Sequence, residues 1–145
     1  MTITQLSVFV ENSPGALARV TGILAKNNID IRAMSLAETQ NFGVLRLIVD
    51  DYRKAGEVLE KNNIVFHFPN VVAAAIPDEP GGLAQVLSLL ADASVNITYM
   101  YAFIAVSGHC ATVVLRISSA QRQRAIDALT AGGVRIFDEK DISSL

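Results

Sequence analysis

The chain contains an internal repeat, and this feature restricts its possible folds more than any other. Residues 12–31 align with residues 78–97 at a shift of 66, and eight of the twenty aligned positions are identical. Farther along the chain the shift becomes 70, which places four extra residues in the second copy, around 106–110. The period is too long for a solenoid, and there are only two copies. We therefore expect two homologous small domains, residues 1–69 and 70–145.

Both copies show the same succession of strand and helix patterns. Apolar residues recur at every second position in the expected strands and at helical spacing in the expected helices. In the first copy, strands are expected at 3–10, 29–36, 43–49 and 64–68, and helices at 14–26 and 51–61. In the second copy, strands are expected at 71–76, 95–105, 111–117 and 134–137, and helices at 83–93 and 120–130. This βαββαβ order predicts an α+β protein of two ferredoxin-like units, each with its helices on one face of an antiparallel sheet.

The loop before the first helix recurs in both copies, as ENSPGALARV and DEPGGLAQV. Proline is ordinary at a helix start, because its missing N–H would have no partner there. Glycine costs helix stability, so we expect a second reason for it, such as a ligand that approaches the backbone. With Ser13 or Glu79 as the N-cap, the first N–H groups of the helix and the positive end of its dipole suit a carboxylate.

Polar residues near this loop fit the other half of an α-amino acid. Asn12 and Asp78 can accept a hydrogen bond from an ammonium group, and Asn12 can also donate to a carboxylate. Asp30 and Asn96 begin the second strand of each unit, and we expect them near the same end of the sheet. Plain helix capping is the alternative, because Asn, Asp, Ser and Pro are ordinary at helix starts. The local pattern leaves both interpretations open.

The segments NSPGALARVTGILAKNNIDI and DEPGGLAQVLSLLADASVNI resemble the ACT domain, and the chain resembles a tandem ACT protein nearly from end to end. This resemblance implies a regulatory module that binds small molecules, usually amino acids. It also implies domains that pair side by side through their sheets. The ligand would lie at the domain interface, between the loop after strand one of one domain and the start of strand two of another.

The resemblance also implies a set of ligand-binding residues in each unit. They are Asn12, Ser13, Gly15, Ala16, Asp30 and Ile31 in the first unit, and Asp78, Gly81, Gly82, Asn96 and Ile97 in the second. Asp78 departs from the pattern, because an acid would repel a carboxylate where the first unit has Asn12. The second loop is therefore either structural or faces an ammonium group, and the two sites need not be equivalent.

Charge and composition argue against several classes of protein. The formal net charge of −2 and the pI of about 5.6 lack the basic character of a nucleic-acid-binding protein. The central strand VLRLIV also lacks the aromatic residues that stack on RNA bases. The start MTITQL does not resemble a signal peptide, and the longest apolar run, 99–106, is too short to span a bilayer. With a single cysteine, we expect a cytoplasmic protein without a membrane or nucleic-acid partner.

We find no motif for catalysis or for a bound cofactor. Neither a nucleophile elbow, G-x-S-x-G, nor a phosphate loop, G-x-x-x-x-G-K-[ST], is present in the sequence, so we expect no enzyme activity. His109 and Cys110 are adjacent, but His67 is the only other histidine, and a metal site needs three or four ligands. We expect no metal, a turn with a free thiol at Cys110, and a half-exposed strand position at His67.

Several large side chains in the second strands have a structural explanation. We expect Met34 and its repeat partner Met100 to pack in the core. Tyr99 and Tyr101 share one face of their strand, where they either pack or form the wall of a ligand site.

Two functions are consistent with these features. The first is an amino-acid sensor, expected to be a homodimer, in which the ligand shifts the packing of the domains and a partner detects the change. The second is a regulatory subunit of an amino-acid biosynthetic enzyme that acts mainly through protein–protein contact. The hydrophobic fraction of 51% favours a surface that is hidden against another chain.

Overall fold

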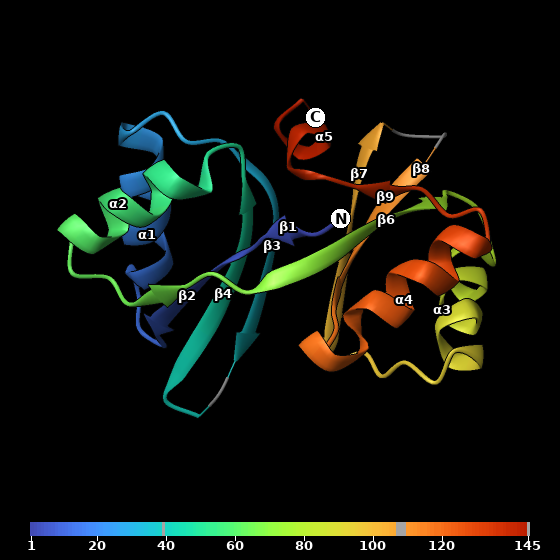
Figure 1. Ribbon diagram of the computed structural model, residues 1–145. Coiled ribbons are helices and arrows are strands. Elements are labelled where there is room, and N and C mark those ends of the chain that lie inside the picture. Colours follow the sequence, from blue (N-terminus) through green and yellow to red (C-terminus); the bar gives the residue numbers. More distant parts are fainter. Residues whose placement is uncertain (39, 107–109, 145) are drawn as a thin grey trace. The chain divides into compact units, whose positions relative to one another are not determined.

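The computed structural model describes residues 1–38, 40–106 and 110–144 (Figure 1). The chain divides into two compact units. The N-terminal unit is Thr4–Pro69, and the C-terminal unit is Met1–Ile3 together with the chain from Asn70 onward. Both have the predicted βαββαβ order and antiparallel sheets, so the ferredoxin-like α+β fold is confirmed. The division into two domains at residues 1–69 and 70–145 remains a prediction.

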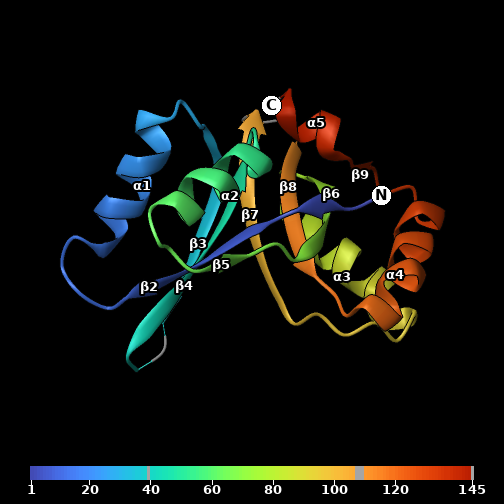
Figure 2. The same ribbon diagram turned by 60° about the vertical axis from the view of Figure 1, so that its left-hand side comes forward.

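In the N-terminal unit the strands are ordered β3-β4-β2-β5, and β4 is antiparallel to both β2 and β3. Its elements are β2 (Leu6–Glu11), α1 (Ala16–Lys26), β3 (Ile31–Glu38), β4 (Phe42–Val49), α2 (Tyr52–Lys61) and β5 (Phe66–His67). The two helices lie side by side on one face of the sheet (Figures 1 and 2). Alternate residues of β2, including Leu6 and Val8, join Leu24 and Leu59 of the helices in the buried core.

The C-terminal unit repeats this arrangement and adds to it. Its elements are β6 (Asn70–Pro77), α3 (Gly82–Asp92), β7 (Tyr99–Val106), β8 (Cys110–Arg116), α4 (Ser119–Ala131), β9 (Ile136–Phe137) and α5 (Glu139–Ser143). The sheet order is β1-β6-β8-β7, and β9 also pairs with β6. The core gathers Val72, Leu90, Leu115 and Leu129, each at most 1% exposed.

A short first strand, β1 (Ile3–Thr4), belongs to the C-terminal sheet, although its sequence position suggests the other unit. It lies beside β6, and Ile3 is fully buried. We expected one continuous strand over residues 3–10. Instead, β1 and β2 are separated at Gln5, whose backbone N–H donates to the carbonyl of Pro69 at 3.0 Å.

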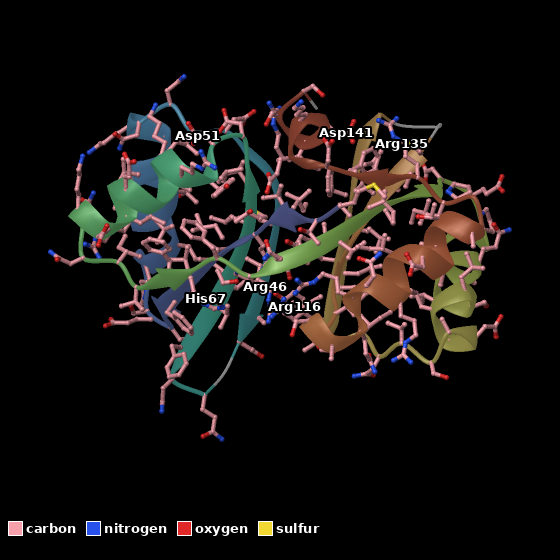
Figure 3. All side chains as sticks on the ribbon, in the orientation of Figure 1. Arg46, Asp51, His67, Arg116, Arg135 and Asp141 are labelled. Atoms are coloured by element: carbon pink, nitrogen blue, oxygen red, sulfur yellow. The ribbon has the colours of Figure 1, made fainter. Side chains whose placement is uncertain are left out.

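The helix starts in this protein are stabilised in different ways. Asp51 caps α2, because its side chain accepts a hydrogen bond from the Lys54 N–H at 3.0 Å (Figure 3). Asp138 caps the short α5, which the sequence patterns did not predict, in a reciprocal capping box with Asp141. The helices α1 and α3 have no side-chain cap and begin after a glycine instead.

The prediction that Met34 and Met100 lie in the core was wrong. Their side chains are 52% and 41% exposed. Both lie on the outermost strands of their sheets, β3 and β7, which have a neighbouring strand on one side only. Alternation placed the two residues on the same face as the core, but it did not show that the helices stop short of these edges.

Among the described residues, none of the helices is both long and apolar enough to cross a membrane.

Candidate functional site

The loop between β2 and α1 is exposed, and hydrogen bonds between its own backbone groups hold its conformation. The Ser13 N–H donates to the Glu11 carbonyl at 2.9 Å, and the Ala16 N–H donates to the Ser13 carbonyl at 3.3 Å. The Asn12 N–H lies 3.5 Å from the carbonyl of Asn41. Asn12 through Gly15 are all exposed, so the predicted ligand-binding residues of this loop are accessible.

The glycine of each loop is explained by backbone conformation. Gly15 has φ of 86° and Gly81 has φ of 90°, a left-handed conformation that side chains with a Cβ rarely adopt. These glycines are the N-cap residues of α1 and α3. The assignment of Ser13 and Glu79 as N-caps, and of a helix opening at Pro14, was therefore wrong. A Cβ at either glycine would meet no atom within 4 Å, so local packing does not require glycine there.

The next residue differs between the two units. Ala16 begins α1 and is half-buried, whereas its repeat partner Gly82 begins α3 and is buried. A Cβ on Gly82 would lie 2.2 Å from the carbonyl oxygen of Pro77. The second loop is thus packed tightly against the end of β6, and Gly82 is a structural requirement there.

The expectation that Asp30 and Asn96 lie near the same end of the sheet as the loops was wrong. In the N-terminal unit, β4 pairs its Phe42 end with the end of β2 and its Val49 with Ile31, at the start of β3. The loop and Asp30 are therefore separated by the length of a strand, roughly 20 Å. The registers of β7 and β6 on β8 separate Asn96 and Ile97 from Asp78 in the same way.

At their actual positions, Asp30 and Asn96 have similar structural contacts. The Asp30 N–H donates to the side chain of Asp50 at 2.9 Å, and the Asn96 N–H donates to the side chain of Gln121 at 2.9 Å. The Asp30 carboxylate also pairs with Arg32 at 3.1 Å. These contacts fix the entry of the chain into the second strand of each unit.

Two cavities flank the loop of the N-terminal unit. The larger, about 520 Å³, lies between the end of β2, the start of α1 and the residues before β5. Its lining includes the predicted residues Ser13, Gly15 and Ala16. The smaller, about 110 Å³, lies on the side of β3 and includes Asn12 and Ser13. Asn12 therefore lines the smaller cavity and Gly15 the larger one, and Ser13 lines both.

Two charged residues of the larger cavity, Glu11 and Arg19, were not predicted. Arg19 follows Gly15 by one helical turn, and its N–H donates to the Gly15 carbonyl at 2.9 Å, so helical spacing was the signal that could have found it. Its guanidinium donates to the carbonyl of Asn62 at 2.9 Å, which anchors one nitrogen and leaves other N–H donors for a ligand. Glu11 lies at the last position of β2.

In the C-terminal unit, a cavity of about 800 Å³ lies beside the second loop. Pro77 and Ala84, on either side of the loop, line it, but the predicted residues Asp78, Gly81 and Gly82 do not. The two loops therefore do not form equivalent sites.

The remaining candidates have structural surroundings. His67 is exposed, and its ring stacks on Phe9 at a centroid distance of 5.6 Å. Tyr99 and Tyr101 are half-buried. His109 lies outside the described residues. Within the described part of the chain, no group of three or more His, Cys, Asp or Glu side chains is placed to hold a metal ion.

Comparison with solved structures identifies chains of the same fold. Protein BT0572 from Bacteroides thetaiotaomicron has 39% sequence identity and a TM-score of 0.91, over 100% of this chain and 98% of the other. The ligand-free regulatory subunit of aspartate kinase from Thermus thermophilus has 19% identity and a TM-score of 0.63, over 88% and 91% of the two chains. The similarity to the aspartate kinase subunit shows a shared fold alone. No curated protein matches the chain.

The family model described as an ACT domain pair matches residues 1–145. It therefore covers both βαββαβ units and both glycine loops described above. The chain belongs to the ACT domain pair family, whose domains are regulatory.

Proposed function

We propose that the protein is a regulatory sensor that binds a free amino acid in the 520 Å³ cavity beside the loop after β2. The observation that carries this proposal is the presence of opposite charges, Arg19 and Glu11, in one cavity with the exposed loop. The regulatory character of the family supports the same function. A solved structure of the same fold is named as a regulatory subunit of aspartate kinase.

The lining of this cavity matches the groups of an α-amino acid. Arg19 is the donor for the carboxylate, and Ser13 lines the same cavity. Glu11 accepts from the ammonium group. Val20 and Ile64 provide apolar walls for the side chain. A volume of about 520 Å³ is within the range of small-molecule sites.

The residues predicted at the start of the second strand, such as Asp30 and Ile31, can contact a ligand in this cavity only if a second copy of the chain contributes them. A single unit holds Asp30 and Ile31 at the opposite end of the sheet from its own loop. We therefore propose a homodimer, in which a second copy brings these residues to the ligand. Binding would then favour one packing of the copies over another, and a partner would respond to that difference.

Replacing Arg19 with glutamine is expected to weaken amino-acid binding about 10- to 100-fold, because a charge-assisted hydrogen bond to the carboxylate is lost. Glutamine is the residue at the equivalent position of α3, Gln85, so the helix tolerates it. A thermal-shift screen of all amino acids identifies the ligand, because a ligand that binds only the native state raises the melting temperature. Calorimetry then measures its affinity for both variants.

The matched control is Arg124→Gln, which removes an exposed arginine from α4, outside the cavity, and should leave the affinity unchanged. A selective hit whose affinity does not respond to Arg19→Gln would place the ligand elsewhere. The absence of any hit would contradict the amino-acid sensor.

A second candidate function, a regulatory subunit of an amino-acid biosynthetic enzyme acting through protein contact, is favoured by the edge strand β3. Met34 and Leu36 are 52% and 51% exposed on this strand, and Leu17 of α1 is 39% exposed. An exposed apolar edge strand is a template for pairing with another chain.

The double variant Met34→Lys, Leu36→Lys is expected to release an enzyme partner that copurifies with the wild type from native lysate, because the lysines oppose burial of this edge. Thr130→Lys, at an exposed position of α4 outside the cavities described above, is the control for added charge. Mass spectrometry of the copurified proteins is the measurement. Copurification of the same enzyme with the double variant would exclude β3 as the contact.

A further inference from the structure

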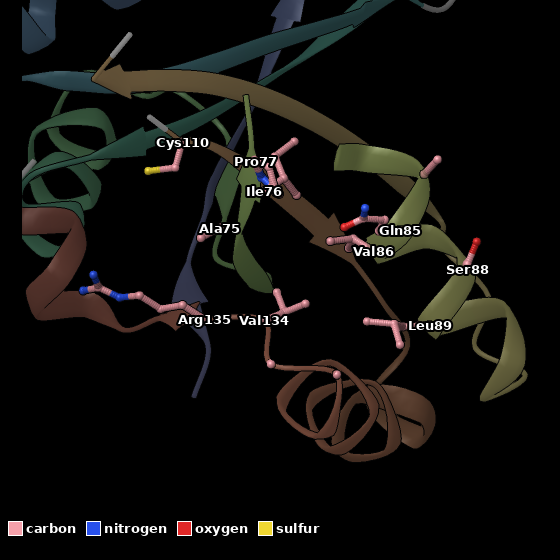
Figure 4. Close-up of a pocket in the computed structure, with 13 residues that line it drawn as sticks. Ala75, Ile76, Pro77, Gln85, Val86, Ser88, Leu89, Cys110, Val134 and Arg135 are labelled. Carbon is pink, nitrogen blue, oxygen red and sulfur yellow. The ribbon is translucent and has the colours of Figure 1, made fainter. Parts of the chain in front are cut away.

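The 800 Å³ cavity of the C-terminal unit has no role in the function proposed above. It lies between the end of β6, the helix α3 and the segment that joins α4 to β9 (Figure 4). Ile76, Val86, Leu89 and Val134 form its apolar lining. Its volume is within the range that small-molecule sites occupy in proteins.

This cavity is the repeat counterpart of the 520 Å³ cavity in the N-terminal unit. At the shifts of 66 and 70 established by the sequence repeat, the apolar walls correspond: Ile76 to Val10, Val86 to Val20 and Val134 to Ile64. The fold therefore builds a cavity at the same place twice, once in each unit, between the first strand, the first helix and the last strand.

The polar residues of the two cavities have diverged. Glu11 corresponds to Pro77, Arg19 to Gln85 and Asn63 to Gly133, so the C-terminal cavity has lost both charges that suit a zwitterion. One charge appears at a new place, where Arg135 corresponds to Val65. The two cavities occupy the same position in their units but carry different polar groups. We therefore expect them to bind different ligands.

Arg135 is the only permanently charged residue among the described residues that line the cavity, and its side chain extends from the edge of the cavity away from Val86 and Leu89 (Figure 4). One nitrogen of its guanidinium pairs with the Asp141 carboxylate at 2.8 Å, and the guanidinium lies 4.9 Å from the ring centre of Phe137 (Figure 3). Its side chain is 67% exposed, and a guanidinium has five N–H donors, so it can receive a second carboxylate.

The partner of Arg135 remains ionised at neutral pH. A hydrogen bond from the Asp138 backbone N–H, together with Arg135 itself, lowers the pKa of Asp141, and burial opposes this shift. A ligand carboxylate must therefore share the guanidinium with an existing negative charge.

We propose that this cavity binds a small molecule with an apolar chain and a single carboxylate. The chain lies against Val86, Leu89 and Val134, and the carboxylate extends past the edge of the cavity to the guanidinium of Arg135. An amino acid fits poorly here, because no acidic side chain among the described lining residues can accept from its ammonium group. The ligand class thus differs from that of the N-terminal cavity.

Octanoate is a suitable probe, with octanol as its neutral analogue, in calorimetric titrations of the full chain. Octanoate should bind, and Arg135→Gln should weaken its binding about tenfold without changing the binding of octanol. Asp141→Asn is the matched control, because it breaks the same ion pair but keeps the guanidinium. It should leave octanoate binding equal or tighter, since it removes the competing charge.

The location of the probe is tested independently by two features of the cavity. Gly133→Asn transplants the residue of the N-terminal unit, where Asn63 has φ of 57° and Gly133 has φ of 76°, so the backbone accepts it. It should weaken octanoate binding by adding an amide beside the apolar lining. Cys110, the only cysteine, also lines the cavity, so octanoate should slow its alkylation by iodoacetamide.

The results that would overturn the proposal are distinct from those that would overturn the amino-acid sensor. A failure of octanoate to bind, an unchanged affinity in Arg135→Gln, or an equal loss in Asp141→Asn would each contradict it. Arg19→Gln should not affect octanoate, and Arg135→Gln should not affect the amino acid. The experiments can therefore contradict either proposed site without contradicting the other.

Discussion

Replacing Gly82 with alanine is expected to lower the free energy of unfolding of the C-terminal unit by about 2–3 kcal/mol, as overpacking of a tight site does. The new Cβ would lie 2.2 Å from the Pro77 carbonyl oxygen and 3.1 Å from its carbonyl carbon. Both atoms belong to the backbone at the end of β6, so no side-chain rotation relieves the contact. Alanine improves helix propensity by at most about 1 kcal/mol, which does not offset the strain.

The control for this prediction is Ala16→Gly in the N-terminal unit, the reverse exchange at the equivalent position. It should cost about 1 kcal/mol or less, because it alters only helix propensity. Urea denaturation followed by circular dichroism gives both values. A Gly82→Ala protein as stable as the wild type would show that the start of α3 can move away from β6.

Replacing Ile3 with alanine is expected to destabilise the C-terminal unit by about 3 kcal/mol, because it leaves a cavity at a fully buried site. Hydrogen exchange measured by mass spectrometry resolves the effect along the chain. Protection should fall in β6 and β9, with which residues 1–3 share a unit and a sheet.

Ile104→Ala is the matched control, because Ile104 lies on β7 of the same sheet and is 57% exposed. Its effect should stay within about 0.5 kcal/mol, as for most surface substitutions. If the loss of protection after Ile3→Ala appeared in β2 and β4 instead, the assignment of residues 1–3 to the C-terminal unit would be wrong.

The repeat and its periodicities predicted the order of the elements in both units, since each strand and helix carries its own apolar pattern. They did not predict the partner of β1. A strand of two residues, Ile3–Thr4, has too little pattern to identify its sheet. The exposure of Met34 and Met100 was missed for a related reason, because alternation assigns a face but not the distance from the helices.

The candidate site was predicted in part. Ser13, Gly15 and Ala16 do line one cavity, whereas Asp30 lies a strand length away. The topology could have corrected this error: two parallel strands joined by a helix place the end of the first and the start of the second at opposite ends of the sheet. The glycine conformation was also recoverable in principle, since glycine is the residue most suited to a positive φ.

The position of β1 has a consequence for the order of events during synthesis. Residues 1–3 leave the ribosome before β6, β8 and β9 exist, yet they complete the sheet that these strands form. The N-terminal unit, residues 4–69, can therefore fold while residues 1–3, which precede it in the chain, have not yet paired with β6. Residues 1–3 thus reach their final place only after the N-terminal unit that follows them in sequence, and the apolar side chain of Ile3 remains exposed to solvent until then.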